Sequence, residues 1–365
     1  MYGAGYLTDL GQIYGRASES QKGPQATMAA KPKPLISILL PAFNAGATLA
    51  AALRSVARQD ERRWECVVLD DGSTDGTVAT AQEFARRDPR FRVIRAPHHG
   101  LVGVLNSGLG HCRGRYVARM DADDLMHRRR LAEQVAMLEA DSDLHAIGCH
   151  VRLFPRREAG PGYRAYESWL NGIDSEERLA RDLFIECPVS HPTLMIRRET
   201  LLEFHYRDLG WPEDYDLILR LATTGHRIGV VPRRRHLWRL GPERLSQIDE
   251  TYTPARFTAC KASFLARSFL ADTARYILWG YGGTGRALRR ALASEGKVPS
   301  HIVEVDPRRL GNLIHGAPVI PPSSLLEIPR LPVVVSVAGA GPRGKIRDAM
   351  NSMGFRETVD YVCAA

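Results

Sequence analysis

From residue 35 to residue 120 the chain alternates short apolar runs with amphipathic segments of helical length. The apolar runs cover residues 35–40, 66–69, 91–94 and 116–120, and the segments between them cover 47–59, 76–87 and 102–112. Short apolar runs bounded by turn residues predict buried strands, and a period of about 3.6 residues predicts helices. Because strands that alternate with helices form parallel sheets with right-handed crossovers, this order predicts an α/β fold with a mostly parallel sheet.

Polar residues follow three of these predicted strands directly. They are Pro41, Phe43 and Asn44 after the first strand, Asp70 and Asp71 at the end of the second, and Asp121, Asp123 and Asp124 after the fourth. Since ligands gather at the carboxyl ends of parallel strands, we expect these loops to converge on one edge of the sheet. A turn followed by a helix cap explains residues 73–75 equally well, but it leaves the pair Asp70 and Asp71 without a reason.

The acidic run after the fourth strand carries three carboxylates within four residues. Such groups repel one another and are costly to desolvate, so a compensating cation is expected. Hard oxygen ligands suit Mg²⁺ or Mn²⁺, which keep coordination positions open for water and substrate phosphate. The alternative is a solvated acidic turn at the start of the next helix, where Asp is also favoured.

The motifs, taken in order, resemble those of the family-2 glycosyltransferases, which have the GT-A fold. They are residues 41–44 (PAFN), 69–77 (LDDGSTDGT), 105–109 (LNSGL), 118–124 (ARMDADD) and 211–221 (WPEDYDLILRL). The resemblance extends from about residue 35 to residue 246. One departure is Arg128, where family members often carry a proline; it affects the start of the next helix more than the chemistry.

The resemblance implies a donor site for a nucleotide-diphosphate sugar. It assigns the nucleoside to the loop of Pro41, Phe43 and Asn44 and to Asp71, with Asp70 in support. A carboxylate that accepts from an imide N–H fits uracil or thymine, and a UDP-sugar is the favoured donor.

The same resemblance places a divalent metal on Asp123, with Asp121 nearer the ribose and Asp124 either behind the site or capping a helix. Arg239 or His236 either closes over the diphosphate or belongs to an ordinary basic surface. Asp214 is the favoured general base for inverting transfer, with Glu213 in support, although two acids at a helix start are favoured by the helix dipole alone. His191 either lines the acceptor or phosphate side or is a structural loop residue.

A second unit is predicted after a helical linker at residues 251–274. Residues 275–365 combine an apolar strand, a G-x-G-x-x-G turn at Gly280, Gly282 and Gly285, a helix, and an acid at Glu304 or Asp306. This spacing is typical of a Rossmann-like domain that binds a nucleotide. The glycines could instead serve only tight turns and close helix packing, and an accessory role is favoured over redox chemistry.

Composition sets the remaining expectations. A net charge of +9 and a pI near 9.4 favour anionic partners, but no recognition pattern for nucleic acid surrounds the arginine clusters. The six scattered cysteines suggest reduced thiols in the cytoplasm, and peripheral contact with the inner face of a membrane remains open. Residues 1–34, which are polar and lack periodicity, predict a mobile leader before a transferase domain at 35–250.

The sequence therefore predicts a metal-dependent, inverting glycosyltransferase. Its acceptor is a glycan, a lipid-linked glycan or a protein, with a role in surface polysaccharide synthesis implied by the resemblance. Two alternatives remain: a nucleotide-binding scaffold, or an NAD(P)-dependent sugar-modifying enzyme that works through the C-terminal unit.

Overall fold

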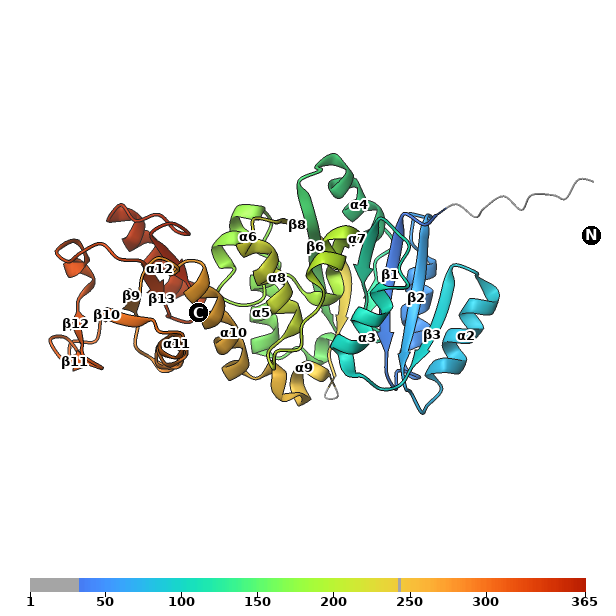
Figure 1. Ribbon diagram of the computed structural model, residues 1–365, viewed down its shortest axis with the longest axis horizontal. Helices are drawn as coiled ribbons and strands as arrows, with labels where there is room; N and C mark the ends of the chain where they lie inside the picture. Colours follow the sequence, from blue (N-terminus) through green and yellow to red (C-terminus); the bar gives the residue numbers. More distant parts are fainter. Residues whose placement is uncertain (1–32, 242–243) are drawn as a thin grey trace, which may run out of the picture. The chain divides into compact units, whose positions relative to one another are not determined.

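The computed structural model describes residues 33–241 and 244–365, so the predicted leader lies outside the described residues except for its last two. The first half of the large sheet follows the predicted alternation (Figure 1). Its elements are β1 (Ile36–Ala42), α1 (Leu49–Ala57), β2 (Trp64–Asp71), α2 (Thr77–Arg87), β3 (Phe91–Ala96), α3 (Gly100–Leu109) and β4 (Tyr116–Arg119). β1 pairs in parallel with both β2 and β4, and β2 pairs in parallel with β3.

Apolar side chains on the two faces of these strands explain why helices cover both faces. Leu39 and Leu69 pack with Leu105 of α3 in one buried cluster. Leu40 and Val68 belong to a second buried cluster, which includes residues of α1. Alternating strand residues point to opposite faces, so each strand needs a helix on either side.

The second half of the large sheet departs from the parallel pattern. Its elements are β5 (Leu125–Met126), α4 (Arg130–Ala140), β6 (Leu144–Phe154), η1 (Arg156–Glu158), α5 (Pro161–Leu170), α6 (Glu176–Asp182), η2 (His191–Thr193), β7 (Met195–Arg197), α7 (Arg198–Phe204), α8 (Glu213–Thr223) and β8 (Arg227–Arg239). β7 runs antiparallel to both β4 and β6, and β5 runs antiparallel to β8. The resulting order is β3-β2-β1-β4-β7-β6-β8-β5.

The predicted helical linker packs against the protein. After α9 (Leu245–Ile248), it begins within η3 (Glu250–Tyr252) and contains α10 (Pro254–Arg267). Leu265 of α10 is fully buried, and the ring of Phe257 lies 5.8 Å from that of Tyr215 on α8. The apolar side that the sequence indicated is therefore covered by protein. In the described part of the chain, no helix has the length and apolar character needed to cross a bilayer.

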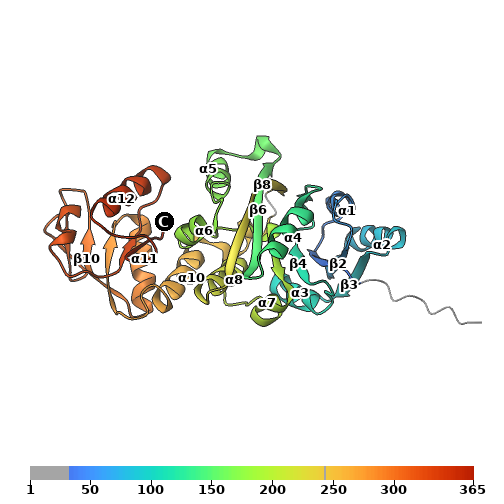
Figure 2. The ribbon, with the colours of Figure 1, turned by 90° about the horizontal axis from the view of Figure 1, so that it is seen from above.

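The C-terminal region forms a second sheet of six strands (Figure 2). Its elements are β9 (Arg275–Trp279), α11 (Gly283–Ser294), β10 (Val298–Val303), β11 (Leu313–Ile314), β12 (Ala317–Ile320), η4 (Pro322–Leu326), β13 (Val333–Val335), α12 (Ala340–Ser352) and β14 (Tyr361–Cys363). The order is β11-β12-β10-β9-β13-β14, and only the β11–β12 pair is antiparallel. The two sheets agree with the α/β class predicted from the sequence.

Candidate active site

The loops after β1 and β2 meet, as the strand order requires. The backbone N–H of Asn44 donates to Ser73 Oγ over 2.9 Å, and the N–H of Thr74 donates to Asn44 Oδ1 over 3.0 Å. Asp75 accepts from the Gly46 N–H and from Thr77, whose helix it precedes. The predicted turn and cap at residues 73–75 therefore exist, and they also lock the first loop to the second.

Asp71 fixes the start of α3 at this edge. Its two carboxylate oxygens accept from the backbone N–H groups of His99 and Gly100, over 2.8 and 3.1 Å. His98 Nδ1 lies 2.9 Å from the same carboxylate, and the His98 ring stacks on Phe43 at 4.4 Å. Phe43 is 49% exposed, so a hydrophobic ring is presented to solvent directly beside a buried carboxylate.

Asp70 differs from its neighbour because part of its carboxylate has no partner. Oδ1 accepts from the Ser73 N–H over 3.2 Å, whereas Oδ2 is buried and makes no hydrogen bond to any described residue. The nearest cation is Arg95, 3.9 Å away and largely exposed. A helix cap at residues 73–75 did not explain the pair Asp70 and Asp71. Asp70 Oδ2 is a buried acceptor that a ligand N–H or O–H could satisfy.

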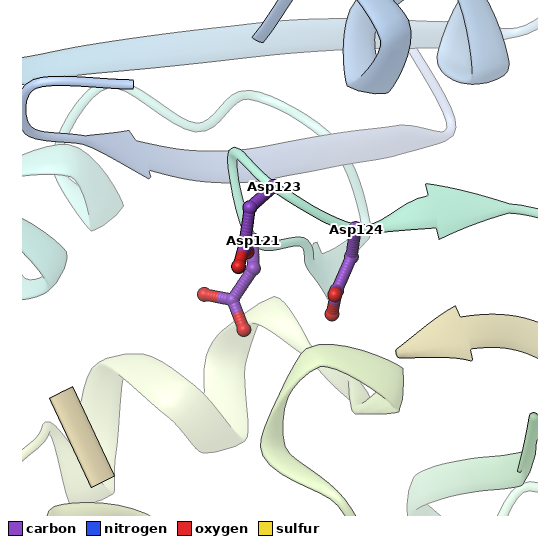
Figure 3. Close-up of side chains that lie close together, drawn as sticks. All are labelled: Asp121, Asp123 and Asp124. Carbon is purple, nitrogen blue, oxygen red and sulfur yellow. The ribbon is translucent and has the colours of Figure 1, made fainter. Parts of the chain in front are cut away.

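The acidic run forms a cluster at the turn between β4 and β5. One carboxylate oxygen from each of Asp121, Asp123 and Asp124 lies within 4.8 Å of the others, and the three side chains leave the turn on the same side (Figure 3). Arg119, buried at the end of β4, binds Asp121 over 2.6 Å. Asp124 accepts from His236 Nε2 and from the Arg239 backbone N–H, each over 2.7 Å.

The neighbouring carboxylates of the cluster oppose the ionisation of Asp123. Burial and the neighbouring charges of Asp121 and Asp124 raise the pKa of Asp123 to about 7. Burial and Asp121 also raise the pKa of Asp124. Burial acts in the same direction on Asp121, but Arg119 together with other nearby basic groups outweighs it and holds the pKa of Asp121 below its usual value. No ion pair or side-chain hydrogen bond to another described residue reaches the Asp123 carboxylate. Oxygen donors with unmet negative charge are what a Mg²⁺ or Mn²⁺ ion binds, so the cluster fits such an ion.

His236 and Arg239 support the acidic turn. His236 is fully buried between Asp124 and Arg130, 3.2 Å from the Arg130 guanidinium, so it does not lie over a diphosphate as one alternative held. Arg239 donates from Nε to the carbonyl oxygen of Asp123 over 2.6 Å. Asp124 caps no helix, because α4 begins only at Arg130. Of the two alternatives for Asp124, the structure shows a residue that holds the turn.

Glu213 and Asp214 open α8 but differ in environment. Glu213 is buried, 3.2 Å from His191 Nδ1, and accepts from the Tyr252 hydroxyl over 2.5 Å. Although burial disfavours its charge, these contacts keep the pKa of Glu213 below the usual value. Asp214 is half-buried, and burial together with the charge of Glu213 raises its pKa to about 8.

His191 connects this pair to the rest of the site. Its Nε2 lies 3.1 Å from the Tyr206 hydroxyl while Nδ1 faces Glu213, and burial together with nearby Arg119 lowers its pKa. The network implies a neutral ring that donates from Nδ1 and accepts at Nε2. Of the two alternatives for His191, the structure supports a role in positioning Glu213.

Comparisons with known proteins agree with this geometry. The sequence model of glycosyl transferase family 2 matches residues 37–204. An uncharacterized glycosyltransferase of Haemophilus influenzae is 30% identical over 200 residues, covering 53% of this chain and 61% of that protein. The putative glycosyltransferase EpsE of Bacillus subtilis is 36% identical over 200 residues, covering 53% of this chain and 69% of EpsE. The chain belongs to glycosyltransferase family 2.

Two further similarities bear on this family-2 glycosyltransferase. The Escherichia coli enzyme WfgD, described as a UDP-Glc:alpha-D-GlcNAc-diphosphoundecaprenol beta-1,3-glucosyltransferase, is 34% identical over 105 residues, or 28% of this chain and 41% of WfgD. The structure of TarS residues 1–349 from S. aureus, in complex with UDP-GlcNAc, superposes with a TM-score of 0.51 at 16% identity, over 70% of this chain and 71% of TarS. The TarS likeness shows the GT-A fold. The chain thus spans less than two thirds of several curated relatives.

The glycine-rich turn of the family-2 glycosyltransferase lies at the end of β9, as predicted. A Cβ on Gly285 would lie 2.1 Å from the Gly280 carbonyl oxygen, so this glycine permits close packing of α11. Gly280 has a positive φ of 92°, and Gly282 faces open space. Asp306 pairs with Arg308 over 2.9 Å, whereas Glu304, directly after β10, accepts from the Tyr281 N–H of the turn over 2.6 Å.

Several groups at the site received no role from the motifs. Arg119 belongs to the motif at residues 118–124, but no function was assigned to it, and His98 lies in a loop whose sequence shows no pattern. Tyr206 and Tyr252 reach the site only through tertiary packing, since they lie on segments distant from β1–β4. The pairing of β4 with β1, which places Arg119 beside Leu39, is the signal that could have indicated a role for this arginine at the site.

Proposed function

We propose that this family-2 glycosyltransferase transfers a sugar from a UDP-linked donor to an acceptor hydroxyl, with inversion and with a divalent metal. The observation that carries the proposal is the acidic cluster, whose central carboxylate has unmet charge, beside a half-buried Asp214 with a raised pKa. Both features fall at the edge of the sheet where ligands of α/β proteins bind.

Recognition of the nucleoside falls to the loops after β1 and β2. Phe43 offers its exposed ring to one face of the base, and the unpartnered Oδ2 of Asp70, next to Asp71, suits an imide N–H. Uracil provides that imide group, and WfgD, the similar protein described above, is named for a UDP-Glc donor. The Asn44 side chain accepts from the Thr74 N–H, so Asn44 contributes to nucleoside recognition by fixing the shape of the loop after β1.

Charge neutralisation of the leaving diphosphate falls to the acidic cluster. Asp123, with Asp121, is placed to hold Mn²⁺ or Mg²⁺, which when bound stabilises negative charge on the diphosphate. Arg119 holds Asp121 in its ionised form, and Arg239 fixes the backbone of Asp123. These residues preorganise the turn, so the site needs little rearrangement when donor binds.

Removal of the acceptor proton falls to Asp214. A general base works best when its pKa lies near the working pH, and a pKa of about 8 meets that condition. The negative charge of Glu213, maintained by His191 and Tyr252, keeps the pKa of Asp214 raised. The acceptor hydroxyl would approach Asp214 from the side opposite the leaving group, which gives inversion.

We also propose the organisation around this reaction. Residues 35–250 form the transferase domain, 251–274 a linker, and 275–365 an accessory unit that could bind a nucleotide at Gly280, Gly282 and Gly285. The six cysteines are all free and buried, which supports a reducing compartment such as the cytoplasm. A role in polysaccharide synthesis is part of the same proposal.

The deciding experiment is isothermal titration of UDP, GDP and CDP with and without Mn²⁺, on wild type and Asp123→Ala. UDP binding that requires both Mn²⁺ and Asp123 is expected. Metal-independent binding that survives Asp123→Ala would contradict the metal site and point to the glycine-rich turn instead. A preference for GDP or CDP would overturn only the UDP assignment.

A further inference from the structure

Four aromatic side chains gather along α5 and the end of β8, and the reaction as proposed does not use them. They are Tyr163, Tyr166 and Trp169 of α5 and Trp238 of β8. The Tyr166 ring lies 5.7 Å from Trp169 and 6.0 Å from Trp238. The three α5 residues are spaced three apart, so they share one face of the helix. We call these four side chains the aromatic wall.

The wall is held in a fixed position by the sheet. Glu167 of α5 accepts from the Leu153 backbone N–H over 3.0 Å, and Asn171 exchanges two hydrogen bonds of 2.9 Å with the backbone of Val151. Both partners belong to β6, and Figure 2 shows α5 beside one end of β6. Because Glu167 and Asn171 fix the last turn of α5 to β6, this helix can present its aromatic rings in one orientation.

Trp238 connects the wall to the metal-binding side of the site. It shares one face of β8 with His236, which binds Asp124, because residues two apart in a strand point the same way. The guanidinium of Arg244 lies 4.4 Å from the centre of the Trp238 ring. That guanidinium is also close enough to Asp121 and Asp123 for its charge to act on their pKa values.

Tyr163 connects the wall to the side of the base, because its hydroxyl accepts from Gln247 of α9, and Tyr252, five residues further on, donates to Glu213, the neighbour of Asp214. Burial raises the pKa of Tyr166, and the negative charges of Glu186 and Asp214 add to the effect. The Tyr166 hydroxyl makes no hydrogen bond to a described residue, and the residue is only half-buried. All four rings keep part of their surface open to solvent, unlike core aromatics such as Tyr215.

We propose that the aromatic wall is the acceptor subsite and that the acceptor presents a saccharide unit to Asp214. This inference rests on the proposed function. A pyranose ring has an apolar face of C–H groups that packs on aromatic rings and an edge of hydroxyls that need polar partners. Tyrosine and tryptophan supply both kinds of contact at low conformational cost. The Tyr166 hydroxyl and Asp214 provide the polar partners here.

The position of the wall argues against the other occupants of such a surface. A nucleotide base would also stack on aromatic rings, but the base is already served by Phe43 at the β1 and β2 loops. An acyl chain would favour aliphatic side chains without polar tips, whereas all four rings here carry a hydroxyl or N–H group, and two of these groups make hydrogen bonds to described residues. Trp169 Nε1, for example, donates to Asp182 over 3.0 Å.

The test uses methyl pyranosides as probes, because they carry no aromatic or lipid group. Saturation-transfer NMR is run on the full chain with UDP and Mn²⁺ present, against methyl β-D-glucoside, methyl β-D-galactoside and methyl N-acetyl-β-D-glucosaminide. Wild type and Tyr166→Phe are expected to bind at least one probe. Tyr166→Leu should weaken that binding by about three- to tenfold, the effect of losing one aromatic contact.

Matched variants keep the outcomes distinct. Phe43→Leu, an aromatic-to-leucine change on the donor side, should weaken UDP and leave the glycosides unchanged. If thermal unfolding shows that Tyr166→Leu is not folded, Trp238→Leu is used in its place, because it removes another ring of the aromatic wall.

The inference is overturned if wild type binds none of the glycosides, or if both leucine variants of the wall bind them as wild type does. UDP affinity, measured in each sample, separates the two proposals. If the protein binds UDP but no glycoside, only the acceptor subsite is contradicted. If it does not bind UDP, the proposed function is contradicted.

Discussion

The acidic edge of the large sheet and the glycine-rich turn of the C-terminal unit both carry ligand-binding motifs, but their electrostatics differ. At the acidic edge the Asp123 carboxylate makes no ion pair with a described residue, and its pKa is raised to about 7. At the glycine-rich turn Glu304 is paired with Arg309 over 3.0 Å and Asp306 with Arg308 over 2.9 Å. The second motif satisfies its own charges, and the first does not.

This difference separates two uses of a motif. Gly285 is explained by packing against Gly280, and Glu304 by its hydrogen bond to the turn, without any ligand. Three clustered carboxylates gain nothing for the fold by their proximity, because mutual repulsion costs free energy. A motif whose groups remain electrostatically unsatisfied in the folded chain is therefore the better indicator of a binding site.

Removing the central carboxylate should give the largest effect. Asp123→Asn keeps the size of the side chain but removes the charge that binds the metal, so kcat should fall by about 10³-fold or more. The matched control is Asp306→Asn in the C-terminal unit, where activity should stay within about twofold because that charge is partly exposed and locally paired with Arg308. Steady-state UDP release from a UDP-sugar measures both. Equal losses in the two variants would erase the contrast between the regions.

Replacing the base should give the next effect. Asp214→Asn should lower kcat by about 10²- to 10³-fold, the usual contribution of a positioned base. Since Asp214 acts as the carboxylate and its pKa is raised to about 8, wild-type kcat should rise with pH and level off above that value. A flat pH profile in wild type would contradict the role of Asp214.

The same raised pKa predicts a stability effect of defined sign. Between the usual aspartate pKa and about 8 the folded state holds a proton that the unfolded state releases, so wild-type stability should fall as pH rises through this window. Asp214→Asn removes this dependence and should be more stable than wild type at pH 8, with the difference vanishing below pH ~4. Thermal unfolding at a series of pH values measures it. If Asp214→Asn is less stable than wild type at pH 8, the result would contradict a raised pKa of Asp214 in the folded state.

The glycine-rich turn should respond in stability instead of catalysis. A Cβ on Gly285 would lie 2.1 Å from Gly280 O and 2.7 Å from Ser336 Oγ, so Gly285→Ala should destabilise the C-terminal unit by about 1–3 kcal/mol. Denaturant unfolding measures this loss, and Gly283→Ala, where a Cβ meets nothing within 4 Å, is the control. UDP affinity at the acidic edge should not change. A loss of UDP affinity would move the nucleotide site to this turn.

Local pattern predicted the first half of the large sheet and the ends of its strands well. β1 to β4 appear within two residues of the predicted runs, because apolar periodicity and turn residues act over short distances. The antiparallel β7 and the long pairing of β6 with β8 could not be predicted, since they depend on contacts between distant segments. The same limit hid Arg119, His98 and Tyr252, which became part of the site only once the sheet was assembled.

Tyr252 offers the finest test, because it joins the linker between the two regions to the base. Tyr252→Phe removes one hydrogen bond that partly compensates the charge of the ionised Glu213. Glu213 stays ionised near pH 8, because its pKa lies below the usual value, so its less compensated charge should act more strongly on Asp214. The pKa of Asp214 then rises, and the rising limb of the kcat profile should move to higher pH, with a change of only about two- to fivefold in the maximal kcat. Tyr163→Phe, which loses a hydroxyl bonded to Gln247, is the matched control and should leave the limb in place. An unshifted limb in Tyr252→Phe would mean that the linker tyrosine only packs against α8 and does not tune the base.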